Sequence, residues 1–278
     1  MKQLIKESFM SVVFLICACI AIAAVALICV FLFKNGIPAM REIGLFDFLL
    51  GMEWAPSDQP ASYGIFPMIL GSVYVTAGAI IFGVPIGILT AVFMARYCPD
   101  RLYKILKPAV DLLAGIPSIV YGFFGLVVLV PLISNLYGGT GNSILTASVL
   151  LGIMILPTII AISESAIRAV PVNYYEGSLA LGATKERAIF RTVLPAAKSG
   201  ILAGIVLGIG RAIGETMAVI MVAGNQARMP VDILKGVRTL TANIVIEMGY
   251  AADLHREALI ATGVLINAIF AVVKRRMD

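Results

Sequence analysis

Two ionisable residues, Arg211 and Glu215, stand within an apolar stretch at residues 200–223 that is long enough to cross a bilayer. A charged side chain at the centre of a membrane helix costs about 2.5–3.5 kcal/mol on insertion scales, so it usually faces a cavity or a partner. The i, i+4 spacing predicts that both lie on one helical face. One interpretation is a structural ion pair that ties the helices together. The other is that Arg211 contacts a translocating anion, because guanidinium donors match oxyanions, while Glu215 holds Arg211 and keeps anion binding weak enough for release.

Three hydroxyl-bearing side chains are further candidates for contact with an oxyanion. Ser118, Tyr121 and Thr216 stand in apolar stretches and offer O–H donors. Such hydroxyls also serve helix packing alone, by bonding across helices, so both interpretations stay open. We interpret Asp111 as an exposed carboxylate at a helix terminus.

The sequence lacks the motifs of a site for nucleotide hydrolysis or for redox chemistry. The glycine cluster at residues 138–141 is followed by Asn142 and lacks the lysine of a phosphate-binding loop. The single histidine, His255, stands in a polar segment where we expect it to be solvated, and Cys17 and Cys19 lack partner ligands for a metal. We therefore expect no catalytic residue, metal or cofactor in this chain. Energy for uphill transport would come from an ion gradient or from another subunit.

The composition is that of an integral membrane protein. Of 278 residues, 60% are hydrophobic and 13% are charged, and the mean hydropathy is +0.99. Soluble domains have roughly 45–50% apolar and about 25% charged residues. The net charge of +5 comes from basic residues placed between the apolar stretches. This distribution favours a membrane surface as the partner over a nucleic acid.

The apolar stretches predict six membrane spans. The first has 25 residues, longer than the apolar part of a secretory signal, and we interpret it as a retained anchor helix. The last has 16 residues, so it must tilt little, thin the bilayer or begin earlier than drawn. The six predicted spans are residues 9–33, 71–95, 109–133, 144–162, 200–223 and 258–273.

The basic residues orient these spans. Segments on the side of the N-terminus hold 14 Lys and Arg residues, and segments on the opposite side hold 6. This bias places both termini in the cytoplasm. In the fifth span, the pairs Gly204/Gly208 and Gly210/Gly214 predict close contact with neighbouring helices.

The long segment at residues 163–198, on the cytoplasmic side, is the most informative. Leu179, Ala180 and Ala183 have the spacing of one apolar face on a short helix, which Gly182 can interrupt. From this pattern alone, the helix could lie on the membrane or dock a protein. The order Glu176, then Gly182, then Leu194 and Pro195 resembles the EAA loop of ABC importer permeases.

This resemblance implies that the segment forms a coupling helix that fits a cleft on a cytoplasmic ATPase. Three residues depart mildly from the family's pattern: Gly177 and Ser178 stand where it prefers two alanines, and Thr192 stands where isoleucine is usual. The residues that the resemblance assigns to ATPase coupling are Glu176, Gly177, Ser178, Leu179, Ala180, Leu181, Gly182, Ala183 and Thr184.

Along nearly its full length, the chain resembles the PstC-type permeases of phosphate importers. The segments that carry the resemblance are residues 53–56, 63–65, 74–77, 115–122, 180–184 and 210–216. The family's fold would be an all-α membrane bundle of six helices, the type I or MetI-like permease bundle. The chain would then be a single permease domain over residues 1–278. Its parts are an anchor helix at 9–33, an outside segment at 35–70, a core bundle at 71–273 and a cytoplasmic coupling loop at 163–198.

The resemblance also implies partners and a location. These are a second, PstA-type permease, two copies of a PstB-type ATPase that carry ATP and Mg²⁺, and a PstS-type phosphate-binding protein, all at a bacterial or archaeal plasma membrane. The outside segments 35–70 and 224–257 would receive the binding protein. In the second of these, an apolar stripe at helical spacing predicts a helix on or in the membrane surface. Its members are Val231, Leu234, Val237, Leu240 and Ile244.

Two rival functions remain. One is a permease for another oxyanion, such as molybdate or sulfate. The other is a gradient-driven secondary carrier, which would need no docking helix.

Overall fold

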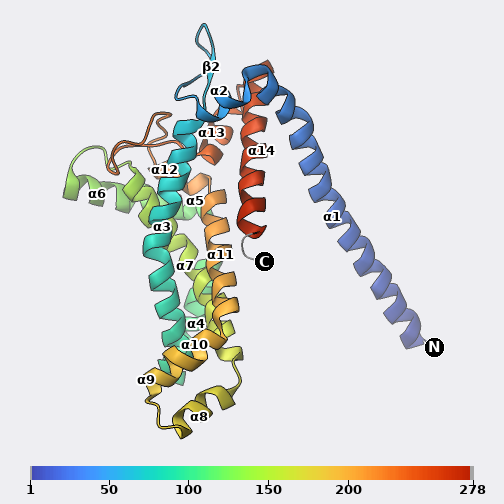
Figure 1. Cartoon of the computed structure of the whole chain (residues 1–278), viewed down its shortest axis with the longest axis vertical. Helices are drawn as coiled ribbons and strands as arrows, with labels where there is room; N and C mark the ends of the chain where they lie inside the picture. Colours follow the sequence, from blue (N-terminus) through green and yellow to red (C-terminus); the bar gives the residue numbers. More distant parts are fainter. Residues whose placement is uncertain (1, 276–278) are drawn as a thin grey trace.

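The chain forms an elongated bundle of helices (Figure 1). The structure, a computed structural model, describes the backbone of residues 2–275 and the side chains of residues 10–272. Within the described residues, five helices are each long and apolar enough to cross a membrane, and the bent pair Lys185–Ala196 and Lys198–Gly214 brings the number to six. This agrees with the six spans predicted.

The helices are α1 (Lys2–Ile43), α2 (Leu45–Leu50), α3 (Phe66–Val92), α4 (Asp100–Gly115), α5 (Ser118–Phe124), α6 (Val130–Tyr137), α7 (Ile144–Ala169), α8 (Val172–Ala180), α9 (Lys185–Ala188), α10 (Leu194–Ala196), α11 (Lys198–Gly214), α12 (Met217–Val222), α13 (Leu240–Glu247) and α14 (Asp253–Arg275). Three π-helical segments, η1 (Phe93–Tyr97), η2 (Gly125–Leu129) and η3 (Ile189–Val193), continue α3, α5 and α9. The strands β1 (Trp54–Ala55) and β2 (Ser62–Tyr63) form an antiparallel hairpin, with Trp54 opposite Tyr63.

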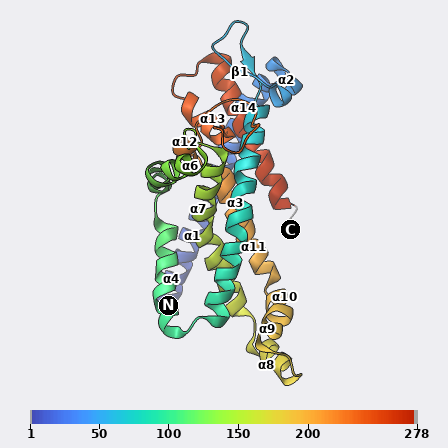
Figure 2. The same cartoon turned by 90° about the vertical axis from the view of Figure 1, so that its left-hand side faces the viewer.

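Helices α3, α7 and α11 form the centre of the bundle and lie side by side in both views (Figures 1 and 2). Small residues allow the close approach that membrane helices use for packing. A Cβ atom added to Gly208 of α11 would lie 2.8 Å from Cγ1 of Ile159 on α7, and one added to Gly204 would lie 3.0 Å from Oγ of Ser163. The predicted close contact of the Gly204/Gly208 pair is therefore confirmed.

Helix α1 leaves the bundle and packs only its later part against α14 (Figure 1). It continues as one helix well past the predicted boundary at residue 33, to Ile43. Most side chains between residues 10 and 33 are exposed and apolar, as expected of a helix that faces lipid. The close contact with α14 is at Gly36, where an added Cβ would lie 2.9 Å from Cα of Ala261.

The third predicted span, 109–133, is not one helix. Helix α4 ends at Gly115, and α5 begins at Ser118 after an extended Ile116 with ψ of 128°. The physical reason is Pro117, which disfavours helical backbone at the residue before it. The apolar helix that follows runs over Ser118–Tyr137, and Figure 1 shows its last part, α6, lying across the bundle.

Four other spans have boundaries that differ from the predicted ones. The second span, 71–95, lies within the longer helical stretch Phe66–Tyr97. The fifth span, 200–223, breaks between Gly214 and Met217, where α11 ends and α12 begins. The fourth span is the part of α7 that precedes residue 163, and α7 continues to Ala169. The last span begins at Asp253, which resolves its apparent shortness.

The predicted helical stripe over residues 231–244 is wrong in its first part. Residues before Leu240 form an irregular segment, and only Leu240 and Ile244 lie on a helix, α13. The segment bonds to other elements instead: the N–H of Val237 donates to the carbonyl of Ala223 at 2.8 Å. The first N–H groups of a helix have no carbonyl partner within the helix. At the start of α7, the N–H groups of Ile144 and Leu145 donate instead to the carbonyls of Lys235 and Ile233.

Candidate functional site

Arg211 lies in the last turn of α11 and is half-buried. Its Nη1 donates to Oγ1 of Thr158 on α7 at 3.5 Å, a long hydrogen bond between the two central helices. The guanidinium therefore keeps most of its donors free for other partners.

Glu215 is not on the same helix as Arg211. Its backbone is extended, with φ of −70° and ψ of 131°, because α11 ends at Gly214. Its Oε1 accepts from the N–H of Ala218 at 3.1 Å, which caps the first turn of α12. Its backbone carbonyl accepts from Oγ1 of Thr241 at 3.1 Å. The predicted shared helical face is therefore wrong. Among the described side chains, the ion pairs within 4.0 Å do not include Arg211 with Glu215.

The structure separates the three predicted hydroxyls. Thr216 stands in the break beside Glu215 and donates to the carbonyl of Gly214 at 3.2 Å. Tyr121 is buried and donates to the carbonyl of Leu113 at 2.9 Å, so it bridges the break at Pro117. Ser118 is the half-buried first residue of α5. Only Thr216 lies at the same break as Glu215.

Four hydroxyl residues that the sequence analysis missed surround Glu215: Ser72, Thr76, Thr239 and Thr241. With Glu215 they line a cavity of about 10 Å³, next to an apolar cavity of about 100 Å³. The first volume suits about one water molecule, so a phosphate-sized anion does not fit there in this conformation. The i, i+4 spacing of Ser72 and Thr76 on α3 is the signal that could have found them.

The predicted coupling segment projects from the end of the bundle as α8 (Figures 1 and 2). Helix α8 ends at Ala180, and Gly182 has a left-handed φ of +83°. The predicted apolar face of Leu179, Ala180 and Ala183 is therefore split, because Ala183 lies beyond the end of the helix. The residues from Glu176 to Thr184 are exposed or half-buried, and Leu181 is 91% exposed.

The base of α8 is fixed to the bundle. Tyr175 packs on a buried apolar cluster that includes Val170, Ile189 and Val193. Thr192 donates its hydroxyl to Oγ of Ser178 at 3.3 Å. An exposed tip on a packed base can dock a partner and move with α7, which leads directly into α8.

A buried carboxylate at the same end ties α7 to α4. Glu164 is 3% exposed, and Tyr103 donates to its Oε1 at 3.0 Å. Lys107 lies 3.5 Å from its Oε2, and Arg168 also pairs with it. Asp111 is an exposed carboxylate on α4, 3.4 Å from Lys107, in agreement with its predicted surface role. The sequence analysis missed Glu164, although the i, i+4 pair with Arg168 was a visible signal.

At the opposite end, His255 is not solvated as predicted. Its side chain is only 13% exposed, and its Nε2 lies 2.9 Å from Oε2 of Glu247. Within the described residues, no group of three or more His, Cys, Asp or Glu side chains could hold a metal ion.

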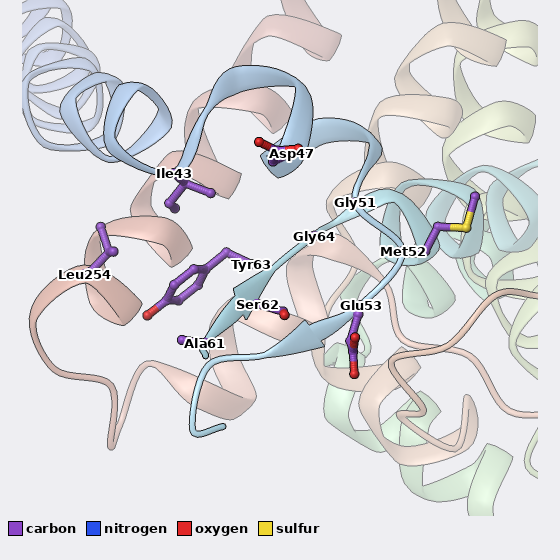
Figure 3. Close-up of a pocket in the computed structure, with 10 residues that line it drawn as sticks. All are labelled: Ile43, Asp47, Gly51, Met52, Glu53, Ala61, Ser62, Tyr63, Gly64 and Leu254. Atoms are coloured by element: carbon purple, nitrogen blue, oxygen red, sulfur yellow. The ribbon is translucent and has the colours of Figure 1, made fainter. Parts of the chain in front are cut away.

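A cavity of about 420 Å³ lies at this end, between α1, α2 and the hairpin (Figure 3). Asp47 and Glu53 are the charged residues of its lining, and Figure 3 shows them on opposite sides of the hairpin. Because no cation lines it, this cavity is unsuited to an anion.

Comparisons with known proteins agree on one family. A family model described as "Binding-protein-dependent transport system inner membrane component" matches residues 83–278. The chain is 42% identical over 237 residues to the "Probable ABC transporter permease protein YqgH" of Bacillus subtilis, covering 84% of this chain and 77% of that protein. It is 34% identical over 282 residues to the "Phosphate transport system permease protein PstC" of Xylella fastidiosa (strain 9a5c), covering 93% of this chain and 86% of that protein.

The fold is similar to that of a chain in a solved bacterial alginate ABC transporter, crystallised in complex with an alginate pentasaccharide-bound periplasmic protein. The TM-score is 0.63, over 95% of this chain and 92% of that chain. The sequence identity is 17%, so this similarity concerns the fold alone.

Proposed function

This chain belongs to the family of binding-protein-dependent transport system inner membrane components, and on that premise we propose that it is the transmembrane permease subunit of an ATP-driven importer of inorganic phosphate. The predicted all-α permease fold, of type I or MetI-like architecture, is confirmed by the family and by the similarity in fold. The observation that carries the phosphate assignment is the 34% identity to a phosphate permease over 93% of this chain.

Arg211 and Glu215 are the residues that we propose for the pathway. Arg211 stands in the last turn of α11, close to the α11–α12 break, and discontinuous helices of this kind form substrate sites in several transporter folds. A guanidinium with free donors is suited to a tetrahedral oxyanion. Glu215 would limit how tightly the anion is held, so that it can also leave. Thr216 would add a hydroxyl, whereas Tyr121 would support the pathway only through its bond across the Pro117 break.

The driving force would come from a partner ATPase. The segment from Glu176 to Thr184 would dock into that ATPase, which would carry ATP and Mg²⁺, and this chain would supply no catalytic group. Motion of α8 would pass through its packed base to α7 and α4, and would tip the bundle between two openings. A second homologous permease, a second ATPase copy and an extracytoplasmic phosphate-binding protein would complete the assembly.

The orientation follows from the distribution of basic residues. The end of the bundle that carries α8 would face the cytoplasm, with both termini, and the hairpin end would face the binding protein. The protein would then lie in a bacterial or archaeal plasma membrane as a multi-pass subunit.

The test is anion selectivity in a reconstituted complex. The chain is co-expressed with its partner permease and ATPase, placed in proteoliposomes with ATP, and supplied with the phosphate-loaded binding protein. Uptake of radiolabelled phosphate that survives an excess of sulfate or molybdate, and is abolished by an excess of unlabelled phosphate, is the expected result. Preferential uptake of sulfate or molybdate would overturn the phosphate assignment and leave the permease function in place.

A further inference from the structure

The carboxylate of Glu247 accepts hydrogen bonds from three different segments of the chain. It lies at the end of α13 and its side chain is 8% exposed. Trp54 in β1 donates its Nε1–H to Oε2 at 2.8 Å, and the guanidinium of Arg238 pairs with Oε1. His255 on α14 lies 2.9 Å from Oε2, and its Nε2 is the donor because a carboxylate only accepts. The hairpin, the segment before α13 and α14 therefore meet at one buried charge.

Further contacts make this a connected network. Arg238 also donates to Oδ1 of Asn243 at 3.0 Å and to the backbone carbonyl of Asn225 at 3.0 Å. The rings of Trp54 and His255 meet edge to face, with centroids 6.0 Å apart. Removal of one donor leaves a buried charge partly unpaired, so the members of such a network form and separate together.

The other end of α13 reaches the proposed pathway. Oγ1 of Thr241 donates to the backbone carbonyl of Glu215 at 3.1 Å, in the break between α11 and α12. The N–H of Leu240 donates to Oγ of Ser72 on α3 at 2.9 Å. Helix α13, about 12 Å long at 1.5 Å per residue, thus joins the hairpin network to the break.

We propose that α13 is the outer gate of the pathway, and that Glu247 is the positioning residue that holds it closed. This inference rests on the proposed function. The hairpin, residues 54–63, is the part of the network that reaches furthest from the bundle (Figure 1). A binding protein that docks there would move Trp54, weaken the Glu247 network and release α13 from Glu215.

The chain offers its own probe, because Trp54 is its only tryptophan. The full complex is prepared in lipid nanodiscs with 5-fluorotryptophan, and a parallel sample with Trp54→Phe identifies the Trp54 fluorine resonance. In the unmodified chain, we expect the phosphate-loaded binding protein to shift this resonance. In Glu247→Gln, the resonance of the undocked complex should already lie near the docked position.

The rate of ATP hydrolysis by the complex is an independent measure of whether the gate is released. A gate released by Glu247→Gln should raise binding-protein-independent hydrolysis by about fivefold or more, the lower end of typical coupling between linked sites. The matched control is Glu257→Gln, which changes an exposed carboxylate on α14 and should leave hydrolysis unchanged. A merely structural role for Glu247 would lower the amount of assembled complex and would not raise this hydrolysis.

Substitutions of His255 keep the test informative if Glu247→Gln fails to assemble. His255→Gln retains an N–H donor and should behave as the unmodified chain does. His255→Leu removes the donor and should raise binding-protein-independent hydrolysis. Equal hydrolysis in these two variants, or a Trp54 resonance that docking leaves unchanged, would overturn the gate. If the resonance and hydrolysis respond as expected but no phosphate is taken up, the proposed substrate is wrong and the gate stands.

Discussion

The hydroxyl of Tyr121 donates to the backbone carbonyl of Leu113 at 2.9 Å, across the break that Pro117 makes between α4 and α5. The same carbonyl accepts from the N–H of Ile116 at 3.4 Å, so the hydroxyl supplies a second and shorter hydrogen bond across the break. This bond assigns Tyr121 to the support of the bundle, with no free hydroxyl for a passing anion.

Tyr121→Phe should therefore reduce stability more than transport. Loss of this partly buried hydrogen bond should cost about 0.5–1.5 kcal/mol, because the carbonyl of Leu113 keeps its bond from Ile116. The melting temperature should fall accordingly. The concentration of phosphate at half-maximal uptake should stay the same. A large rise in that concentration with no change in melting temperature would place the hydroxyl in the pathway.

Arg211→Gln should abolish phosphate uptake while the chain still assembles with its ATPase. The amide keeps donors for Thr158 but loses the charge that attracts the anion. Arg101→Gln, at an exposed position on α4, is the control and should transport normally. Uptake assays and co-purification of the ATPase provide the two readings. Normal uptake by Arg211→Gln would remove Arg211 from the pathway.

Two glycines of the coupling segment should respond differently to alanine. Gly182 has φ of +83°, a conformation that costs an L-residue about 1–2 kcal/mol, so Gly182→Ala should displace the exposed Leu181 and sharply reduce uptake. Gly177 lies inside α8 with no atom within 4 Å of an added Cβ, and Gly177→Ala should support normal uptake. ATP-dependent uptake of the two variants is compared at equal levels of assembled complex. Equal uptake by both variants would show that the turn at Gly182 has no part in coupling.

Alanine substitutions at two glycines of α11 should have different effects on stability, because only one of the two glycines lies in close contact with α7. A Cβ at Gly208 would lie 2.8 Å from Ile159, so Gly208→Ala should destabilise the bundle by about 1–3 kcal/mol through overpacking. The nearest atom to a Cβ at Gly210 is 3.7 Å away, on Phe270, and Gly210→Ala should be tolerated. Thermal unfolding in detergent measures both. The reverse order would contradict the α7–α11 contact.

The buried carboxylate of Glu164 should contribute more to stability than the exposed Asp111 nearby. Removal of a buried partner costs about 3–5 kcal/mol, and the partial exposure of Lys107 and Arg168 reduces this to about 1–3 kcal/mol for Glu164→Gln. Asp111→Asn should change the melting temperature little. If the two variants had the same melting temperature, Glu164 would not be the link between α4 and α7.

The sequence predicted the bundle well because apolar length is a local property. Helices α1, α7 and α14 each contain a predicted span, and α3 together with η1 contains another. The last span is longer than predicted because its helix begins at Asp253. The break at Pro117 had a local signal in the proline itself. The break at Glu215 had no comparable local signal. The i, i+4 spacing of Arg211 and Glu215 favoured one continuous helix that carries both residues on the same face. Contacts of Glu215 with Ala218 and Thr241 accompany the break, and these depend on how the chain folds back.

The network around Glu247 could not be predicted for the same reason. Trp54 and Glu247 are 193 positions apart, so no spacing rule connects them. His255 stands among polar residues, and its burial depends on Trp54, which packs against its ring. The hydroxyls near Glu215 come from α3 and from the segment that starts α13, again far apart in the sequence.

The central claim is that this chain transports only when a nucleotide-hydrolysing partner moves it. Its most direct test compares proteoliposomes that hold this chain alone with proteoliposomes that hold the full complex, with ATP and binding protein supplied to both. Accumulation of radiolabelled phosphate against its gradient by the full complex only is the expected result. Uphill accumulation by vesicles that hold this chain alone would contradict the claim.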